Sequence, residues 1–192
     1  MYLSRNGGPW EHYLTTDIFT LYMPSSRVKQ ITRDYYDDLY PSGVTLNGHK
    51  GIVFSSNRHF NELKKERIDS IIPVGNLDLF FYNLETKDPN LVRLTNTPFS
   101  DEKHAQQIAE GQYAFISEEN GIRNIHQGVI DSVYLGKKKN YYINGDLYAQ
   151  DQIADSVEVD SITTYDDFKW VGKNYQTSDF TYNINEWDFA LK

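Results

Sequence analysis

The sequence of 192 residues contains no cysteine, which excludes disulfide bonds, thiolate-ligated zinc, iron–sulfur clusters and cysteine nucleophiles. It also has no apolar run approaching the roughly 18 residues that a membrane-spanning helix needs. Basic residues are in the minority: 19 lysines and arginines stand against 27 acidic residues, and the formal net charge is −8. Nucleic acids and anionic membrane surfaces attract basic patches, so we expect neither as the partner and no membrane insertion.

Motifs that carry known chemistry are absent as well. The sequence has no Gly-x-Ser-x-Gly nucleophile elbow, no Gly-x-Gly-x-x-Gly dinucleotide motif and no Gly-x-x-x-x-Gly-Lys-Ser/Thr phosphate loop. Its five histidines do not form a metal-binding His-x-x-x-His pair. We therefore expect a non-enzymatic protein with no catalytic residue, no cofactor and no metal ligand. The sequence leaves open whether a divalent cation binds in the acidic loops.

Aromatic side chains, in contrast, are plentiful, with 15 tyrosines, 10 phenylalanines and 3 tryptophans. Such a content is typical of folded chains and of half-buried strand surfaces. Short runs rich in β-branched and aromatic residues alternate with turn signals such as Asn47-Gly48, Glu110-Gly111 and Asn144-Gly145. This pattern predicts an all-β fold. The predicted strands are residues 17–22, 27–31, 51–55, 77–84, 91–94, 113–117 and 122–126.

Four other segments are harder to place. Residues 61–70 could form about two helical turns inside an insertion, but their apolar residues are too sparse for a strong helical stripe. Residues 101–110 are charged and are predicted to hold a single turn. Lys137-Lys138-Lys139 is predicted as a solvated turn, and residues 179–184 as a further strand.

An internal repeat is the most informative pattern. Residues 17–57 and 78–118 each contain a strand that begins near an aspartate, a strand that ends in threonine, an acidic loop and a strand that contains serine. Thr32 and Thr95 are each followed by an aspartate six residues later, and matched positions lie 61 to 63 residues apart. One such sheet cannot cover both of its own faces, so the copies are expected to stack.

The repeated unit resembles the TolB-like β-propeller repeats of bacterial envelope proteins. Those repeats read Asp-Ile-Tyr, then Leu-x-x-Leu-Thr, then a polar loop with proline, then Ile-x-Phe-x-Ser-x-Arg-x-Gly. The matching residues are 17–19, 28–32, 38–41 and 52–58 in the first unit, and 78–80, 91–95 and 113–121 in the second. The second unit departs from the pattern, because residues 104–111 replace the family's Pro-x-Trp-Ser-Pro-Asp-Gly stretch.

The resemblance implies that residues 1–192 form one partial β-propeller segment of about three to four blades. The clear repeat units are at about 17–58 and 77–126, residues 1–13 end a preceding blade, and residues 131–192 are expected to hold a further one. A closed propeller typically has about four to eight blades. Either the chain therefore continues in a longer protein, or its open sheet edges self-associate.

Two groups of residues are candidates for a site. Adjacent carboxylates recur at Asp37-Asp38 and Asp101-Glu102. They could form a cation site or an acid/base pair, or they could accept hydrogen bonds from backbone amides and nearby hydroxyls. Trp10, Tyr13, Tyr35, Tyr36 and Tyr40 form an aromatic group near the first pair, either as a recognition surface or as packing between sheets. The residues predicted to contact a partner are Tyr35, Tyr36, Asp38, Tyr40, Asp101 and Glu102.

The TolB-like resemblance also implies a function. We expect a scaffold that binds another protein in the periplasm or cell envelope. The alternatives are an accessory propeller domain of a larger peptidase or glycan-active hydrolase, and a carbohydrate-binding propeller. The first ten residues do not read as a signal peptide, so export would require a signal outside this sequence.

Overall fold

The computed structural model describes residues 2–6, 15–46, 48–63, 74–149, 152–153 and 157–188, and the chain is all-β. This confirms the fold class expected from the sequence, while the propeller arrangement stays a prediction. The chain divides into two compact units, Met1–Ile130 with Gly172–Lys192, and Asp131–Val171. Among the described residues, no helix is long and apolar enough to cross a membrane.

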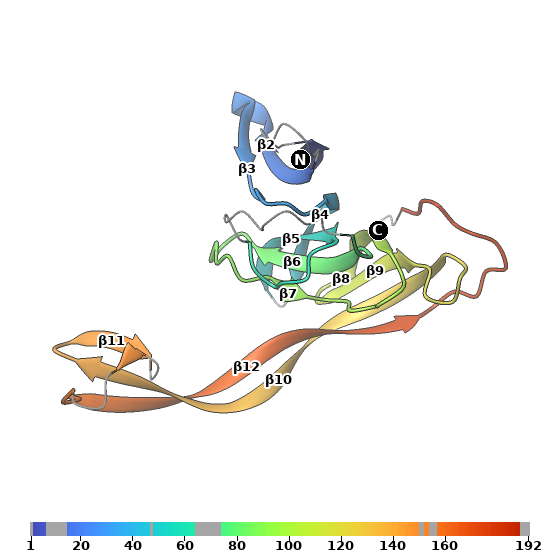
Figure 1. Cartoon of the computed structure of the whole chain (residues 1–192). Coiled ribbons are helices and arrows are strands. Elements are labelled where there is room, and N and C mark those ends of the chain that lie inside the picture. Colours follow the sequence, from blue (N-terminus) through green and yellow to red (C-terminus); the bar gives the residue numbers. More distant parts are fainter. Residues whose placement is uncertain are drawn as a thin grey trace. The chain divides into compact units, whose positions relative to one another are not determined.

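The first unit is built from antiparallel sheets in which neighbours in sequence are neighbours in space (Figure 1). The first sheet contains β1 (Tyr2–Asn6), β2 (Thr16–Tyr22) and β3 (Arg27–Gln30), with the 3-10 turn η1 (Met23–Ser25) between β2 and β3. The second contains β4 (Asp38–Leu46), β5 (His49–Ser56), β6 (Asp78–Asn83) and β7 (Val92–Arg93). The third begins with β8 (Glu102–Ala109), β9 (Gln112–Ser117) and β10 (Asn124–Ile143).

The second sheet is covered on both faces. Residues 51–56 of β5 and 78–82 of β6 are all buried, and successive strand residues point to opposite sides of a sheet. On one side β1 and β2 of the first sheet pack against β4, and on the other β8 packs against β4, β5 and β6. The apolar residues of the central strands are therefore shielded by neighbouring sheets.

A hydrophobic cluster joins the first and second sheets. Ile18 of β2 packs with Ile52 and Phe54 of β5 and with Phe80 and Tyr82 of β6, all of them buried. Phe54 and Phe80 are cross-strand partners with ring centroids 6.3 Å apart. A side chain at Gly51 would clash with the ring of Phe81 on the adjacent strand, so this β5 position requires the absence of a Cβ atom.

Six of the seven predicted strands are confirmed within a few residues at their ends, and the seventh, predicted at 122–126, is the beginning of the much longer β10. The strands at residues 146–149 and 161–176 were missed, and so were two strands within the repeats. The polar loop expected after Thr32 contains β4, and residues 102–109, predicted as a single turn, form β8. Both strands contain an irregularity in register, after Leu39 and after Lys103. Such a bulge breaks the alternation by which a strand is recognised in sequence.

The second unit, Asp131–Val171, is a β-ribbon (Figure 1). It contains the later part of β10, β11 (Asp146–Ala149) and the earlier part of β12 (Ser161–Gln176), and both β11 and β12 pair with β10. The turn predicted at Asn144-Gly145 is confirmed, with φ angles of 52° and 86°. These positive angles suit the tight turn that joins β10 to β11.

Two other predictions were wrong. Lys137-Lys138-Lys139 lies within β10 instead of a turn, where the ammonium groups of Lys137 and Lys138 form ion pairs of 2.9 and 2.8 Å with Asp166 and Asp167. Residues 179–184 contain no strand. The helical candidate at 61–70 lies mostly outside the described residues, and Glu62 in its first part forms a β-bridge with Asn90.

Candidate functional site

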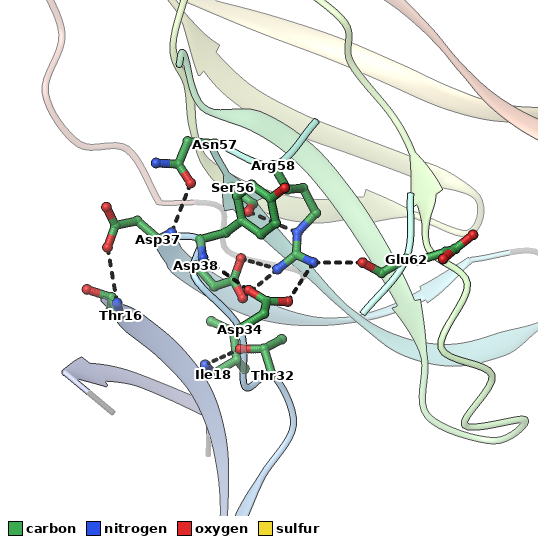
Figure 2. A network of polar contacts seen from close by, with 11 residues as sticks. Thr16, Ile18, Thr32, Asp34, Asp37, Asp38, Ser56, Asn57, Arg58 and Glu62 are labelled. Carbon is green, nitrogen blue, oxygen red and sulfur yellow. Dashed lines mark hydrogen bonds and ion pairs between the residues drawn. The ribbon is translucent and has the colours of Figure 1, made fainter. Parts of the chain in front are cut away.

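A buried arginine lies at the centre of a polar network between β3 and β5 (Figure 2). Arg58 follows β5, and its side chain is fully buried. Its Nη2 donates to both carboxylate oxygens of Asp38 at 2.6 and 2.7 Å, and its Nη1 donates to Asp34 and to the backbone carbonyl of Glu62 at 3.1 and 3.2 Å. With Nε donating to Ser56 Oγ at 3.0 Å, every N–H direction of the guanidinium has an acceptor.

Aromatic rings surround this guanidinium. The Arg58 Cζ atom lies 5.2 Å from the ring centroid of Tyr36, 5.6 Å from that of Phe54 and 5.8 Å from that of Phe80. Rings exclude water and attract a cation over their faces. The network therefore connects the charged loop after β3 with the hydrophobic cluster that joins the first and second sheets.

Burial shifts the protonation of the acids in this network. Burial and the neighbouring Asp38 carboxylate raise the pKa of Asp34 to about 7, although Arg58 opposes the shift. Burial and Asp38 likewise raise the pKa of Asp17 to about 6. Burial disfavours the charge on Arg58, but Asp38 and Asp34 together raise its pKa. One guanidinium thus pairs with two carboxylates, and Asp34 and Asp17 bind their protons more tightly than they would in water.

The second repeat places a buried acid at the same point without an arginine. Glu102 is fully buried at the start of β8 and pairs with Ser117 of β9, as Asp38 at the start of β4 pairs with Ser56 of β5. The hydroxyls of Thr97 and Ser117 donate to the Glu102 carboxylate at 2.6 and 3.0 Å. The residue two positions after Ser117 is a glutamate, where the first repeat has Arg58.

The environment of Glu102 favours the protonated form of its carboxyl group. Burial raises the pKa of Glu102 to about 7, the hydroxyls of Thr97, Ser100 and Ser117 oppose this, and the charge of Asp78 adds to it. The two repeats therefore handle a buried acid differently. The first pairs it with a guanidinium, and the second surrounds it with hydroxyl groups.

Other contacts are the same in both repeats. Thr32 Oγ1 accepts a hydrogen bond from the backbone N–H of Ile18 at 2.8 Å, and Thr95 Oγ1 accepts one from Leu79 at 2.7 Å. In each case the threonine lies two residues after a strand, β3 or β7, and binds the preceding strand of the same sheet, β2 or β6. The threonine in each copy thus has a structural role that explains its recurrence.

The first acid of each pair binds a backbone amide. Asp37 Oδ1 accepts from Thr16 N at 3.1 Å, and Asp101 Oδ1 accepts from Leu77 N at 2.9 Å. Asp37 thus corresponds to Asp101, and Asp38 to Glu102. The sequence repeat matches Asp38 with Asp101, because each lies six residues after its threonine. The contacts show that this match is off by one residue. These contacts are those of loop acids that satisfy backbone donors.

A partly exposed aromatic group lies next to the buried networks. Tyr40 of β4 and His104 of β8 occupy equivalent bulge positions, both with left-handed φ angles, of 52° and 54°. Their ring centroids are 4.2 Å apart. Trp187 Nε1 donates to the His104 carbonyl at 3.0 Å, and Gln106 Nε2 donates to the Trp187 carbonyl at 3.3 Å. Non-glycine residues in this backbone region are uncommon, and bulges often re-aim side chains.

The six predicted partner-contact residues fall into two sets. Tyr36, Asp38 and Glu102 are at most 2% exposed and contact other residues of the chain, so they present almost no surface to a partner. The other three, namely Tyr35, Tyr40 and Asp101, are partly exposed. Contact with a partner stays a prediction for all six.

Three residues of these groups were not identified from the sequence as site residues. Arg58 stood in the repeated strand motif, which was the signal that it had a role. Asp34 and Trp187 carried no such signal, because they meet their partners only in the folded chain. The aromatic residues Trp10 and Tyr13, grouped with the tyrosines in the sequence, lie outside the described residues.

Within the described part of the chain, no group of three or more histidine and acidic side chains could hold a metal ion. Comparisons of the chain with family models, with curated proteins and with solved structures give no match. The functional argument therefore depends on the geometry of this chain.

We predict that Arg58→Met strongly destabilises the protein. Removing the guanidinium leaves Asp34 and Asp38 buried without a counter-charge, which typically costs about 3–5 kcal/mol. Arg123→Met is the matched control, because Arg123 pairs with Glu118 at a partly exposed position and such pairs contribute about 0–1 kcal/mol. Urea denaturation measures both, and an equal loss in the two variants would contradict the account of the network.

We also predict that Glu102 makes stability decrease as the pH rises. The folded-state pKa of about 7 lies above the ordinary 4.5, so the folded state holds a proton that the unfolded state has released between these values. The stabilising effect is complete below pH 4.5 and is lost by the time the pH exceeds about 7.

The measurement is urea denaturation of the protein and of Glu102→Gln across this pH range. The stability difference between them should change by on the order of 2 kcal/mol, in favour of the unchanged protein at low pH. Glu158→Gln, at an exposed glutamate, is the control and should follow the unchanged protein. A stability difference for Glu102→Gln that does not vary with pH would rule out a retained proton.

Proposed function

We propose that the chain is a non-enzymatic β-propeller segment that acts as a protein-interaction scaffold in the bacterial cell envelope. The observation that carries the proposal is the second sheet, a four-stranded antiparallel meander covered on both faces by sheets that repeat its polar contacts. Propeller blades are four-stranded antiparallel sheets that repeat around an axis, each covered by its neighbours. The envelope location and the partner come from the TolB-like resemblance of the repeats.

In this proposal β4 to β7 form one complete blade. The first sheet supplies the last three strands of the blade before it, and β8, β9 and the start of β10 supply the first strands of the blade after it. The matching positions of Asp37 and Asp101 support this assignment. Each precedes the first strand of a sheet and binds a backbone amide at the start of the strand two back along the chain, which is β2 for Asp37 and β6 for Asp101. The bulges at Tyr40 and His104 then lie at the same place in successive blades.

The proposed contact surface is the aromatic group of Tyr40, His104 and Trp187. All three side chains are partly exposed, whereas the repeated carboxylates Asp38 and Glu102 are fully buried. Aromatic residues are enriched at protein interfaces, because they contribute large contact areas at a low cost in side-chain entropy. Burial lowers the pKa of His104, so its imidazole is neutral at pH 7 and suits an apolar contact.

The test is recovery of a partner with an affinity-tagged chain from the envelope fraction of the encoding bacterium. Tyr40→Asn removes the ring while asparagine tolerates the left-handed backbone at this position. The unchanged protein should recover a defined partner, and Tyr40→Asn should reduce the recovered amount at least tenfold, on the order of what losing one central aromatic contact causes.

The control is Tyr22→Asn, the same substitution at a residue that is 63% exposed on the first sheet. It should recover the partner as the unchanged protein does, and circular dichroism should show all three proteins folded. Equal recovery by Tyr40→Asn and Tyr22→Asn would remove the aromatic group from the proposed interface.

A further inference from the structure

The contacts that the two repeats share occur a third time, in the third sheet. This sheet continues from β10 to β12, and Ser178 follows β12 as Thr95 follows β7. Ser178 Oγ accepts a hydrogen bond from Ile125 N at 2.8 Å and donates one to Asn124 Oδ1 at 2.9 Å. Thr95 Oγ1 contacts β6 in the same two ways, through a backbone N–H and a side-chain oxygen. Asn124 thus corresponds to the aspartate that begins β6.

The chain after β12 also repeats the contacts that precede β8. Asn183 Oδ1 accepts a hydrogen bond from Arg123 N at 2.8 Å, the same kind of contact that Asp101 makes before β8. The next residue, Ile184, donates to the Arg123 carbonyl at 3.4 Å, as the first residue of β8 donates to the Leu77 carbonyl at 2.7 Å. Ile184 therefore lies where the first strand of a further sheet would begin.

Residues 184–187 lie beside β8, as β8 lies beside β4. The Trp187 carbonyl accepts a hydrogen bond from Gln106 Nε2 of β8 at 3.3 Å, and the Thr45 carbonyl of β4 accepts one from Gln107 Nε2 of β8 at 2.9 Å. Successive residues of a strand point to opposite sides, so β8 contacts β4 on one side and residues 184–187 on the other. Residues 184–187 thus occupy the place of a first strand, but they pair with no strand in the described part of the chain.

The first sheet has the complementary edge. β1 corresponds to β5 and β9, because it pairs with β2 as they pair with β6 and β10. On their other side, β5 and β9 pair with a first strand, β4 or β8. Among the described residues, no such strand pairs with β1. The backbone groups on an unpaired side of a strand favour the addition of another strand.

We infer that residues 184–187 of one copy of this chain pair with β1 of a second copy and supply the first strand of its first sheet. The exchange is mutual, so a two-fold axis forms the contact twice. Two copies of a three-sheet chain give six sheets, within the range of about four to eight blades in closed propellers. The inference rests on the propeller arrangement of the proposed function, but not on the proposed partner.

The second and third sheets give the register of this contact. The residues that begin β4 and β6 both lie opposite Ser56 of β5, one on each side, and those that begin β8 and β10 both lie opposite Ser117 of β9. In the first sheet Arg5 of β1 lies opposite Asp17, which corresponds to the residue that begins β6. Ile184 of the second copy therefore lies opposite Arg5.

Cysteine pairs test this register directly, because the chain has no cysteine of its own. Residues directly opposite in antiparallel strands have Cα atoms about 4.5–5.5 Å apart, which suits a disulfide. Under mild oxidation the double variant Arg5→Cys with Ile184→Cys should therefore shift to twice the mass of one chain on a non-reducing gel. An equimolar mixture of the two single variants should also form this dimer, whereas neither single variant alone should.

The matched control is Tyr2→Cys with Ile184→Cys. This pair places the first thiol three residues further along β1, about 10 Å away and on the other face of the sheet, so no dimer band should form. Circular dichroism should show every variant folded, and sedimentation velocity should show the unchanged chain as a dimer.

A monomer of the unchanged chain at all concentrations would overturn the inference, and so would a disulfide that closes within one chain. A folded double variant that does not cross-link, or a control that cross-links as well as the predicted pair, would contradict the register. Recovery of a partner is a separate result. A cross-linked dimer that recovers no partner would support the pairing and would reject only the proposed scaffold role.

Discussion

The second sheet cannot stand alone, because the central strands are apolar on both faces. Residues 51–56 and 78–82 are buried without interruption, whereas a sheet with one solvated face would show alternating exposure. The first sheet covers one face through Ile18, and β8 covers the other. The order of the sheets, the position of the loops between them and the burial of the repeated acids all depend on this requirement.

Buried polar groups between the sheets are a consequence of covering the second sheet on both faces. Chain segments that cross from one sheet to the next carry Asp38 and Glu102 into the interior, where each needs hydrogen-bond donors. Arg58 supplies them in one repeat, and the hydroxyls of Thr97 and Ser117 supply them in the other. A repeated sequence thus keeps the position of a buried acid while its partners differ between copies, and only one of the copies has a compensating charge.

Much of the architecture could be predicted from the sequence, because β2, β5, β6 and β9 are runs of β-branched and aromatic residues between turn signals. β4 and β8 could not. Both contain a left-handed residue, Tyr40 or His104, and a bulge that interrupts the alternation. β8 also consists largely of polar residues that are rare in strands. The length of β10 was underestimated because consecutive lysines are typical of solvated turns. In the structure Lys137 and Lys138 form ion pairs with aspartates on β12, and the sequence does not show that these strands lie side by side.

The site shows a similar division. The paired acids and their recurrence were visible in the sequence. The sequence also offered two roles for them, either a cation or acid/base site or hydrogen bonding to backbone amides and hydroxyls. Arginine is almost never fully buried unless it is paired, so composition alone would not place Arg58 in the interior. Which tyrosines face solvent also depended on packing: Tyr36 lies against Arg58, whereas Tyr40, four residues further on, stays partly exposed at the bulge.

Native-state hydrogen exchange in Ile18→Ala tests most directly whether the second sheet depends on its neighbour. Ile18 belongs to the first sheet and is fully buried against β5 and β6. The account predicts that this truncation lowers the protection of the β5 and β6 amides by about 2–5 kcal/mol, as much as it lowers global stability. Faster exchange confined to β2, with β5 and β6 unchanged, would contradict it.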